Sequence, residues 1–503
     1  MASSGGRLNV LLFMADQMRA DCLGAAGHPV IQTPNLDRLA REGTLCSRAY
    51  VQNPICMPSR ATLFTGRYPR SHRVRTNGVP LPTSEVTVAD VLTGAGYHTA
   101  SFGKLHFTPT GAPPEPHLKE SNQLWRDHPE ELAAWHGPYY GLKHVELSSG
   151  HNFPGGHYGA WLRREHPAAL PLFKQDAALR PPTGAHGSWK SALPVELHAS
   201  TWITDRTIEY LQSRTSTEEP FFAVCSFPDP HHPFAPPAPY AELYDPADVP
   251  LPHSRGEELD SLPPHFRQHF RGGWTRRGPV EAERPEGLPE AHLREIIAHY
   301  YGMISLVDHS IGRVLDALDR TGLAENTLVL FTSDHGELLG DHGLLLKGPF
   351  LYEGLVRIPL LWRLPGRVRA DATMDQLAGH VDVMQTVLDL VGVEAPAGVQ
   401  GQSLAGTLQT GDGSGLRPWV LTEYHTGYDP DLGLKQLRTD RYRLTYYGHP
   451  HFGELFDLQA DPHEERNLFH DPASAGLRHQ LTTMLLDALI ATEDPLPPQI
   501  SFA

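Results

Sequence analysis

Cysteine is scarce in this chain. Only four cysteines occur among 503 residues, at Cys22, Cys46, Cys56 and Cys225, and none forms a Cys-x-x-Cys pair. This pattern excludes the dense disulfide framework that holds small secreted domains together. Reduced thiols are therefore the expectation, and with them a cytoplasmic location.

Long apolar runs are also missing. The run Leu8–Phe13 is short and Asp16 follows it closely, and no stretch approaches the length of a membrane span. The first residues lack the cleavage pattern of a secretory signal. These absences predict a chain without a membrane segment and agree with the cytoplasmic expectation.

Positive charge is in short supply as well. Lysine and arginine number 42 against 58 aspartates and glutamates, which gives a net charge of -16 with the histidines neutral. Such a field repels nucleic acid and anionic membranes, so neither is expected as a partner. An anionic substrate would have to be bound by local cations in a pocket, against the overall charge.

The order of apolar and amphipathic segments predicts the fold class. Buried-type strands alternate with helical patterns as far as about residue 366, which predicts an α/β domain with a large, mostly parallel sheet sandwiched by helices. Later segments alternate like a small antiparallel sheet closed by a helix. We expect a catalytic domain over 1–393 and a C-terminal α+β subdomain over 394–503. The strands expected in the first domain are Leu8–Phe13, His98–Phe102, Pro220–Phe227, Leu328–Ser333 and Val356–Trp362.

Two segments interrupt the α/β pattern. Residues 108–193 are rich in aromatic side chains, histidine and proline, and we expect a loop-rich insertion that walls a substrate pocket, with a lid or a subunit contact as the alternative. Residues 236–289 are rich in proline and charge and predict a solvated excursion. This excursion and the C-terminal segments could supply the contacts of a homo-oligomer, a state that the sequence leaves open.

The stretch Asn53–Gly66 places a cysteine at the start of a predicted helix. Pro58 suits the first turn, so Cys56 lies where the free N–H groups and the helix dipole attract an anion. Arg60 follows four residues later, on the same helix face. The pattern predicts an anion site around one reactive side chain, and a buried structural cysteine is the alternative that these residues leave open.

Metal-binding residue types follow two predicted strands. Asp16 and Gln17 come directly after the first strand, and Asp334 and His335 follow Leu328–Ser333. Ligands of parallel sheets bind beyond the carboxyl ends of the strands, so these residues are expected to converge. Such a set suits Ca²⁺ or Mg²⁺, His335 leaves room for Mn²⁺, and no spacing typical of zinc occurs.

Lys104 and His106 follow another predicted strand. If the extended backbone continues, the two side chains share a face that suits an oxyanion, while an exposed strand edge is the alternative. His231 lies in a proline-rich loop after Pro220–Phe227, which would hold its imidazole at the same rim.

These stretches resemble the type I, formylglycine-dependent sulfatases of the alkaline phosphatase superfamily, along nearly the whole chain. Cys-x-Pro-Ser-Arg followed by Ala-Thr-Leu-Phe-Thr-Gly is similar to the family signature at Cys56 and Arg60. Gly-Lys-Leu-His, which contains Lys104 and His106, resembles the family's Gly-Lys-x-His. Ser-Asp-His-Gly, which contains Asp334 and His335, resembles the family's second metal motif, and Lys347 matches its downstream lysine. Gln17 departs from the pattern, because many members have a second aspartate there.

The resemblance implies hydrolysis of a small aryl, sugar or alkyl sulfate. In the family, a formylglycine-generating enzyme oxidises the cysteine, the aldehyde hydrate is the nucleophile, and one divalent metal is bound, here Ca²⁺ before Mg²⁺ or Mn²⁺. Asp334 would deprotonate the attacking hydroxyl, His231 with Lys347 would protonate the leaving oxygen, and His106 would take the proton of the second hydroxyl. The implied catalytic residues are Cys56, Arg60, Lys104, His106, His231, Asp334 and Lys347, and the implied metal ligands are Asp16, Gln17, Cys56, Asp334 and His335.

Two alternatives remain. Phosphonate monoester and phosphodiester hydrolases share the fold, but they tend to lack the lysine and histidine of Gly-Lys-x-His, so Lys104 and His106 favour sulfate. A non-catalytic homologue that binds anions with unmodified Cys56 is the alternative from another class.

Overall fold

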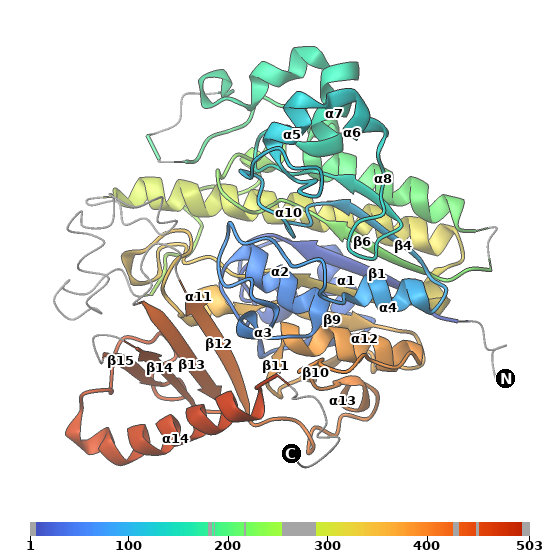
Figure 1. The fold of residues 1–503 in the computed structure, drawn as a ribbon. Helices are drawn as coiled ribbons and strands as arrows, with labels where there is room; N and C mark the ends of the chain where they lie inside the picture. The colour runs from blue at the N-terminus through green and yellow to red at the C-terminus, as the bar shows by residue number, and fades with distance from the viewer. Residues whose placement is uncertain are drawn as a thin grey trace.

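A computed structural model describes residues 7–179, 184–185, 187–215, 218–253, 288–425, 432–448 and 452–494 of the chain. The ribbon has a large α/β body and a smaller C-terminal part made of one sheet and the helix α14 (Figure 1). Most of the predicted excursion over 236–289 lies outside the described residues. No helix among the described residues is long and apolar enough to cross a membrane.

The body is built on a sheet of eight strands. Seven of its strands run in one direction, and β9 is antiparallel to both of its neighbours. The prediction of a large, mostly parallel sheet is therefore confirmed. In spatial order the strands are β10 (Ala372–Met374), β2 (Thr44–Cys46), β9 (Leu360–Arg363), β7 (Thr327–Ser333), β1 (Asn9–Ala15), β6 (Phe221–Ser226), β4 (His98–Gly103) and β5 (His144–Leu147).

Helices cover both faces of this sheet. Alternate residues of the central strand β1 point to opposite sides, as the two-residue repeat of a strand requires. Val10, Leu12 and Met14 pack in one core with α2, α4 and α12, whereas Leu11 and Phe13 pack in a second core with α1, α8 and α10. The helices of the body are α1 (Pro34–Arg41), α2 (Cys56–Thr65), α3 (Pro69–His72), α4 (Val88–Gly94), α5 (Asn122–Asp127), α6 (Pro129–Ala134), α7 (Gly156–Glu165), α8 (Ala199–Ser213), α10 (Glu290–Arg320), α11 (Glu353–Val356), α12 (Val383–Val391) and α13 (Ala405–Thr410).

Two predictions, one about a strand and one about the insertion, are wrong in detail. The expected strand Val356–Trp362 is divided at Pro359, because proline donates no ladder hydrogen bond. Its first part is β8 (Arg357–Ile358), which joins a small sheet with β3 (Ala49–Tyr50) and β11 (Ala378–Gly379), and its second part is β9. The insertion 108–193 is also more regular than expected, since it contains α5, α6, α7 and the edge strand β5.

The C-terminal part is an antiparallel sheet closed by a helix, as predicted. Its strands are β12 (Trp419–His425), β13 (Gly433–Thr439), β14 (Tyr442–Tyr447) and β15 (Gly453–Asp457), and α14 (Ala475–Ala491) packs on them. The sheet is joined to the body where Glu423 N–H donates to the carbonyl of Gln52 over 2.8 Å. The expected division at residues 393 and 394 stays a prediction.

Candidate active site

A cavity of about 640 Å³ lies beyond the carboxyl ends of the central strands. Five of the residues predicted from the sequence line it, and they come from α2, from the segments after β4 and β6, and from the loop that follows β7. These residues are Cys56, Lys104, His106, His231 and Lys347. The cavity is therefore the candidate active site.

Cys56 is the first residue of α2, and its side chain is 1% exposed. The helix is buried along its whole length, and two buried histidines contact its hydroxyl side chains. The Ser59 hydroxyl lies 3.0 Å from Nδ1 of His380, and the Thr62 hydroxyl lies 3.0 Å from Nε2 of His72. These contacts fix the position of Cys56 relative to the sheet.

Arg60 ties the helix to the metal-type carboxylates. Its Nε donates to Asp334 Oδ2 over 2.7 Å, and its Nη2 lies 3.4 Å from Asp16 Oδ2. A third nitrogen, Nη1, donates to the Lys104 carbonyl over 2.7 Å and to the Ser226 hydroxyl over 3.0 Å. Because its guanidinium is fully engaged, Arg60 orients the carboxylates and the Lys104 segment as well as supplying charge.

The two buried carboxylates are ionised. Burial opposes the charge of Asp16, but Lys104, His151 and Arg60 outweigh it and hold the pKa of Asp16 well below its usual range. Burial and the charge of Asp16 oppose ionisation of Asp334, yet Arg60 keeps the pKa of Asp334 below its usual value. Two negative charges therefore face the same small space.

Lys347 lines the cavity and contacts three other residues of the site. Its Nζ lies 3.0 Å from Cys56 Sγ, 2.8 Å from His231 Nε2 and 3.2 Å from His335 Nε2. Burial, together with the neighbouring His151 and Lys347, holds the pKa of His231 well below its ordinary value. His231 is thus a neutral imidazole that accepts from an ammonium group.

Lys104 and His106 reach the cavity by a different route from the one expected. Strand β4 ends at Gly103, and His106 has a φ of 60°, so the backbone does not stay extended. The carboxylate of Glu120 accepts from the backbone N–H groups of residues 106 to 108 and holds this turn. Burial, followed by the charge of Lys104, lowers the pKa of His106 to about 3.

Gln17 lies beside the two carboxylates. Its backbone N–H donates to Asp334 Oδ1 over 3.0 Å, and its Nε2 donates to Glu337. With the amide nitrogen committed to Glu337, the amide oxygen faces Lys347 Nζ at 3.3 Å. The oxygen of Gln17 therefore accepts from the lysine whose Nζ also lies near Cys56 and His335.

The sequence model of the family described as Sulfatase matches residues 8–393, which is more than half of the chain. The chain belongs to the sulfatase family. A second model, described as N-sulphoglucosamine sulphohydrolase, C-terminal, matches residues 340–490. The expectation of an enzyme of the sulfatase family and the alkaline phosphatase superfamily is confirmed.

This sulfatase has similar proteins along nearly its whole length. The multifunctional alkaline phosphatase superfamily protein PehA of Trinickia caryophylli is 34% identical, over 94% of this chain and 93% of that protein. An arylsulfatase of Clostridium perfringens is 30% identical, over 97% and 95%. The solved phosphonate monoester hydrolase of Agrobacterium radiobacter is 28% identical with a TM-score of 0.79, over 97% and 96% of the two chains.

The donor set of the sulfatase site fits a divalent metal ion. Asp16, Cys56, Asp334 and His335 are buried, and one ligand atom from each lies within 4.8 Å of the others. His335 Nδ1 lies 2.8 Å from the Gly336 carbonyl, which leaves Nε2 directed at the cluster. Asp16, Asp334 and His335 offer the oxygen and nitrogen donors that divalent cations take, so the set suits a cation at this point.

His151 is a residue of the cavity that the sequence did not single out. Its ring stacks on His231 with centroids 3.5 Å apart, and its Nε2 lies 2.9 Å from Lys104 Nζ. His151 comes shortly after β5, a strand whose short sequence is hidden among the aromatic residues of the insertion. Recognition of that strand would have placed His151 at the same rim as His231.

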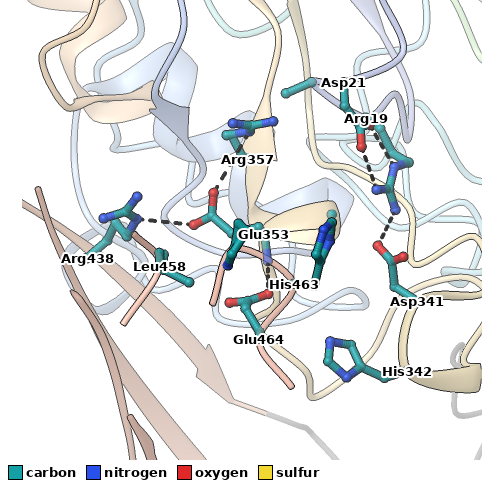
Figure 2. A pocket seen from close by; sticks show the side chains of 13 residues that line it. Arg19, Asp21, Asp341, His342, Glu353, Arg357, Arg438, Leu458, His463 and Glu464 are labelled. Atoms are coloured by element: carbon teal, nitrogen blue, oxygen red, sulfur yellow. Dashed lines mark hydrogen bonds and ion pairs between the residues drawn. The ribbon is translucent and has the colours of Figure 1, made fainter. Parts of the chain in front are cut away.

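A second cavity of about 390 Å³ lies where the body meets the C-terminal sheet (Figure 2). Its charged side chains are paired with one another. Arg19 binds Asp21 and Asp341 over 2.7 Å each, and Arg438 Nε lies 3.2 Å from Glu353 Oε1 (Figure 2). None of the predicted site residues is among the residues that line this cavity.

Proposed function

We propose that this sulfatase hydrolyses sulfate esters of small molecules through a formylglycine hydrate derived from Cys56, with one bound divalent metal. The observation that carries the proposal is the cation-rich cavity around Cys56 in a chain of net charge -16. Lys104, Lys347 and Arg60 supply local positive charge there, as an anionic substrate requires.

The metal and the formylglycine would each have defined neighbours in this arrangement. Asp16, Asp334 and His335, with the oxygens of Gln17 and position 56, would hold the metal, which supplies Lewis-acid polarisation. The formylglycine hydrate at position 56 supplies a hydroxyl nucleophile and releases sulfate without leaving a stable ester on the enzyme. Ca²⁺ is the metal that we propose first, because oxygen donors predominate.

The remaining steps belong to side chains of the chain itself. Asp334 lies in the cluster with Cys56 and accepts the proton of the attacking hydroxyl. Lys104 and Lys347 bind the sulfate oxygens, where negative charge grows in the transition state. The pair of Lys347 and His231, 2.8 Å apart, delivers a proton to the leaving oxygen, and His106 accepts the proton of the second hydroxyl.

The walls of the cavity favour a leaving group with an apolar body. Beyond the charged floor, the lining includes Met57, Pro80, Pro113, Leu118 and Phe153, and the Phe153 side chain is 42% exposed. The one carboxylate on this wall, Glu120, already accepts from three backbone N–H groups. Aryl and alkyl sulfates are therefore our first substrate candidates, ahead of sulfated sugars, whose hydroxyls need polar partners.

Two measurements test the proposal. The mass of the peptide that contains Cys56 is expected to show an aldehyde in active preparations, and the Cys56→Ala variant is expected to lose aryl sulfate hydrolysis. A plain thiol in fully active protein would sink the formylglycine mechanism and favour the anion-binding alternative. Retained turnover in Cys56→Ala would exclude position 56 as the nucleophile.

A phosphonate monoester hydrolase is the second candidate. The similarity to the solved enzyme of Agrobacterium radiobacter favours it, whereas Lys104 and His106 in the cavity favour sulfate. The kcat/KM for an aryl sulfate, compared with that for the matching aryl phosphonate monoester, decides between them. A higher value for the phosphonate would replace our proposal.

A further inference from the structure

A second group of metal-binding side chains lies on the edge of the main sheet, outside the cavity of Cys56. Its members are His136, His144 and Glu146, and one ligand atom from each lies within 4.8 Å of the others. The edge strand β5 carries His144 and Glu146, and the link between α6 and β5 carries His136. We propose that these three side chains form a zinc site, an inference that does not depend on the hydrolytic function.

The backbone brings the three ligands together. His144 and Glu146 are two residues apart on a strand, so their side chains point to the same face. The N–H of Val145, which lies between them, donates to the carbonyl of His136 over 2.8 Å. This hydrogen bond holds His136 beside the strand at the height of the other two ligands.

The rings of His136 and His144 are nearly parallel, with 5° between their planes, and each offers a nitrogen close to Glu146. Nδ1 of His136 lies 3.3 Å from the carbonyl of Val145, which fixes this nitrogen as the donor and leaves Nε2 with its lone pair. The centroids of the His136 and His144 rings are 5.1 Å apart, and Nε2 of His144 lies 3.1 Å from Glu146 Oε1. Ligands of one zinc ion at about 2.1 Å from the metal have a similar spacing.

His157 supports the site without being a ligand. Its ring stacks on His136 with centroids 4.8 Å apart. Both of its nitrogens are engaged, Nδ1 by the N–H of Leu147 over 2.9 Å and Nε2 by the carbonyl of Trp135. His157 therefore restricts the rotation of the His136 ring, and a restricted ring loses less entropy when it binds an ion.

The donor types select the ion. Two imidazoles and one carboxylate match the nitrogen and oxygen ligands of zinc, with water in the fourth position, whereas Ca²⁺ and Mg²⁺ take oxygen ligands. His144 and Glu146 have side chains 32% and 17% exposed, so an ion can reach them from solvent. The positive charge that opposes binding is Arg206, which acts on the carboxylate of Glu146.

An ion at this point would join the link before β5 to the sheet edge. The same link contains Tyr139, whose hydroxyl lies 3.2 Å from Glu120 Oε1. Glu120 in turn holds the backbone of residues 106 to 108 at the wall of the Cys56 cavity. A zinc ion bound here would thus stiffen the segment behind this wall.

The decisive experiment compares zinc binding in Ca²⁺-saturated wild type and in single variants, by titration calorimetry with ZnCl₂ and by metal counting after dialysis. We expect wild type to bind one more zinc ion than His136→Ala and His144→Ala. Glu146→Gln is expected to bind this ion at least tenfold more weakly, and Arg206→Gln several-fold more tightly. Excess Ca²⁺ or Mg²⁺ is expected not to compete.

His128→Ala is the matched control. The His128 side chain is 53% exposed, and its Nδ1 lies 3.7 Å from Glu131 Oε2. This pair belongs to neither of the candidate metal-binding groups among the described residues, so loss of His128 should leave the number of bound zinc ions unchanged. Crystals of unmutated protein soaked in ZnCl₂ should show anomalous signal at the zinc edge between the three ligands, whether or not a variant folds. Equal zinc counts in wild type and His144→Ala, or anomalous signal only elsewhere, would overturn the site.

Discussion

The amide of Gln17 is oriented by Glu337. Glu337 is fully buried, its Oε1 accepts from the N–H groups of Leu339 and Leu346, and its Oε2 accepts from Gln17 Nε2. An aspartate in place of Gln17 would face this carboxylate with like charge, which is unfavourable at a buried site. Gln17 and Glu337 therefore belong together, and the departure from the family's second aspartate has a local physical reason.

This pairing predicts the effect of an isosteric change. In Glu337→Gln the two backbone N–H groups keep the remaining oxygen, so the new NH₂ group faces the amide of Gln17 and should reverse it. The amide oxygen then leaves the metal position, and we expect divalent metal affinity to fall about 10–100-fold. Titration calorimetry measures this, and the swapped pair Gln17→Glu with Glu337→Gln should recover affinity. Unchanged affinity in Glu337→Gln would refute the assigned orientation.

His151 is expected to position Lys104 and His231. Its Nε2 lies within hydrogen-bonding distance of Lys104 Nζ, and its ring stacks on His231. Removal of His151 therefore frees both side chains. We expect His151→Ala to lower kcat/KM for an aryl sulfate by about 10–100-fold, since small displacements of positioned groups have effects of this size. The exposed His117→Ala serves as control, and equal kinetics of the two variants would show that His151 has no such role.

At the scale of elements, the turn after β4 depends on an acidic side chain from the insertion. Glu120 is 1% exposed and accepts hydrogen bonds from three successive backbone N–H groups, beginning at His106. It replaces the ladder partners that the strand loses after Gly103. The left-handed backbone at His106 is thus held from a segment more than ten residues away.

Loss of this carboxylate should loosen the turn. Glu120→Ala leaves buried N–H groups without an acceptor, so we expect the free energy of unfolding to fall by about 1–3 kcal/mol. Urea unfolding measures this change. Tyr139→Phe removes only one hydroxyl near Glu120 and should cost less. If the two variants lose equal stability, the backbone contacts of Glu120 are not its main contribution.

At the scale of the whole molecule, buried neutral histidines set the response to acid. Burial lowers the pKa of His72, His342 and His380 to about 3, and that of His157 and His299 to about 4. An unfolded histidine titrates near 6.5, so below that pH the unfolded chain binds protons that the folded chain does not. These histidines therefore contribute a loss of stability as the pH drops from about 6.5 toward 4.

The steepness of this fall can be tested at one position. Each such histidine contributes up to about 1.4 kcal/mol per pH unit below 6.5. His299→Gln, which retains a partner for Ser188, should make the unfolding free energy less steep between pH 6.5 and 5. The exposed His117→Gln should leave the slope unchanged. Identical slopes in all three proteins would contradict the assignment.

The C-terminal sheet is expected to be part of the same folding unit as the body. Arg443 is fully buried and lies over the Tyr352 ring at 4.8 Å, and Gln436 donates to the Leu351 carbonyl over 2.6 Å. A chain that ends at residue 393 would expose this surface. We expect it to be insoluble on expression, with a single calorimetric transition for the full chain; a soluble, folded fragment would show that the two parts are independent.

Much of this protein follows from local sequence. Nearly continuous apolar runs specify β1, β6 and β7, because a strand buried on both faces has few polar positions. Cys56 and Arg60 are four residues apart on one helix, and Asp16 and Asp334 follow buried strands, so ordinary periodicity places them at one rim. The family resemblance rests on these residues.

Tertiary structure decided the rest. The conformation of His106 depends on Glu120, the orientation of the Gln17 amide depends on Glu337, and the position of His151 depends on the short edge strand β5. Glu120 and Glu337 are distant in sequence from the residues they hold, so no periodicity could reveal them, and β5 is too short to be recognised from its pattern. Sequence alone determined which chemical groups gather at the sheet edge, whereas long-range hydrogen bonds determined how each group faces the reaction.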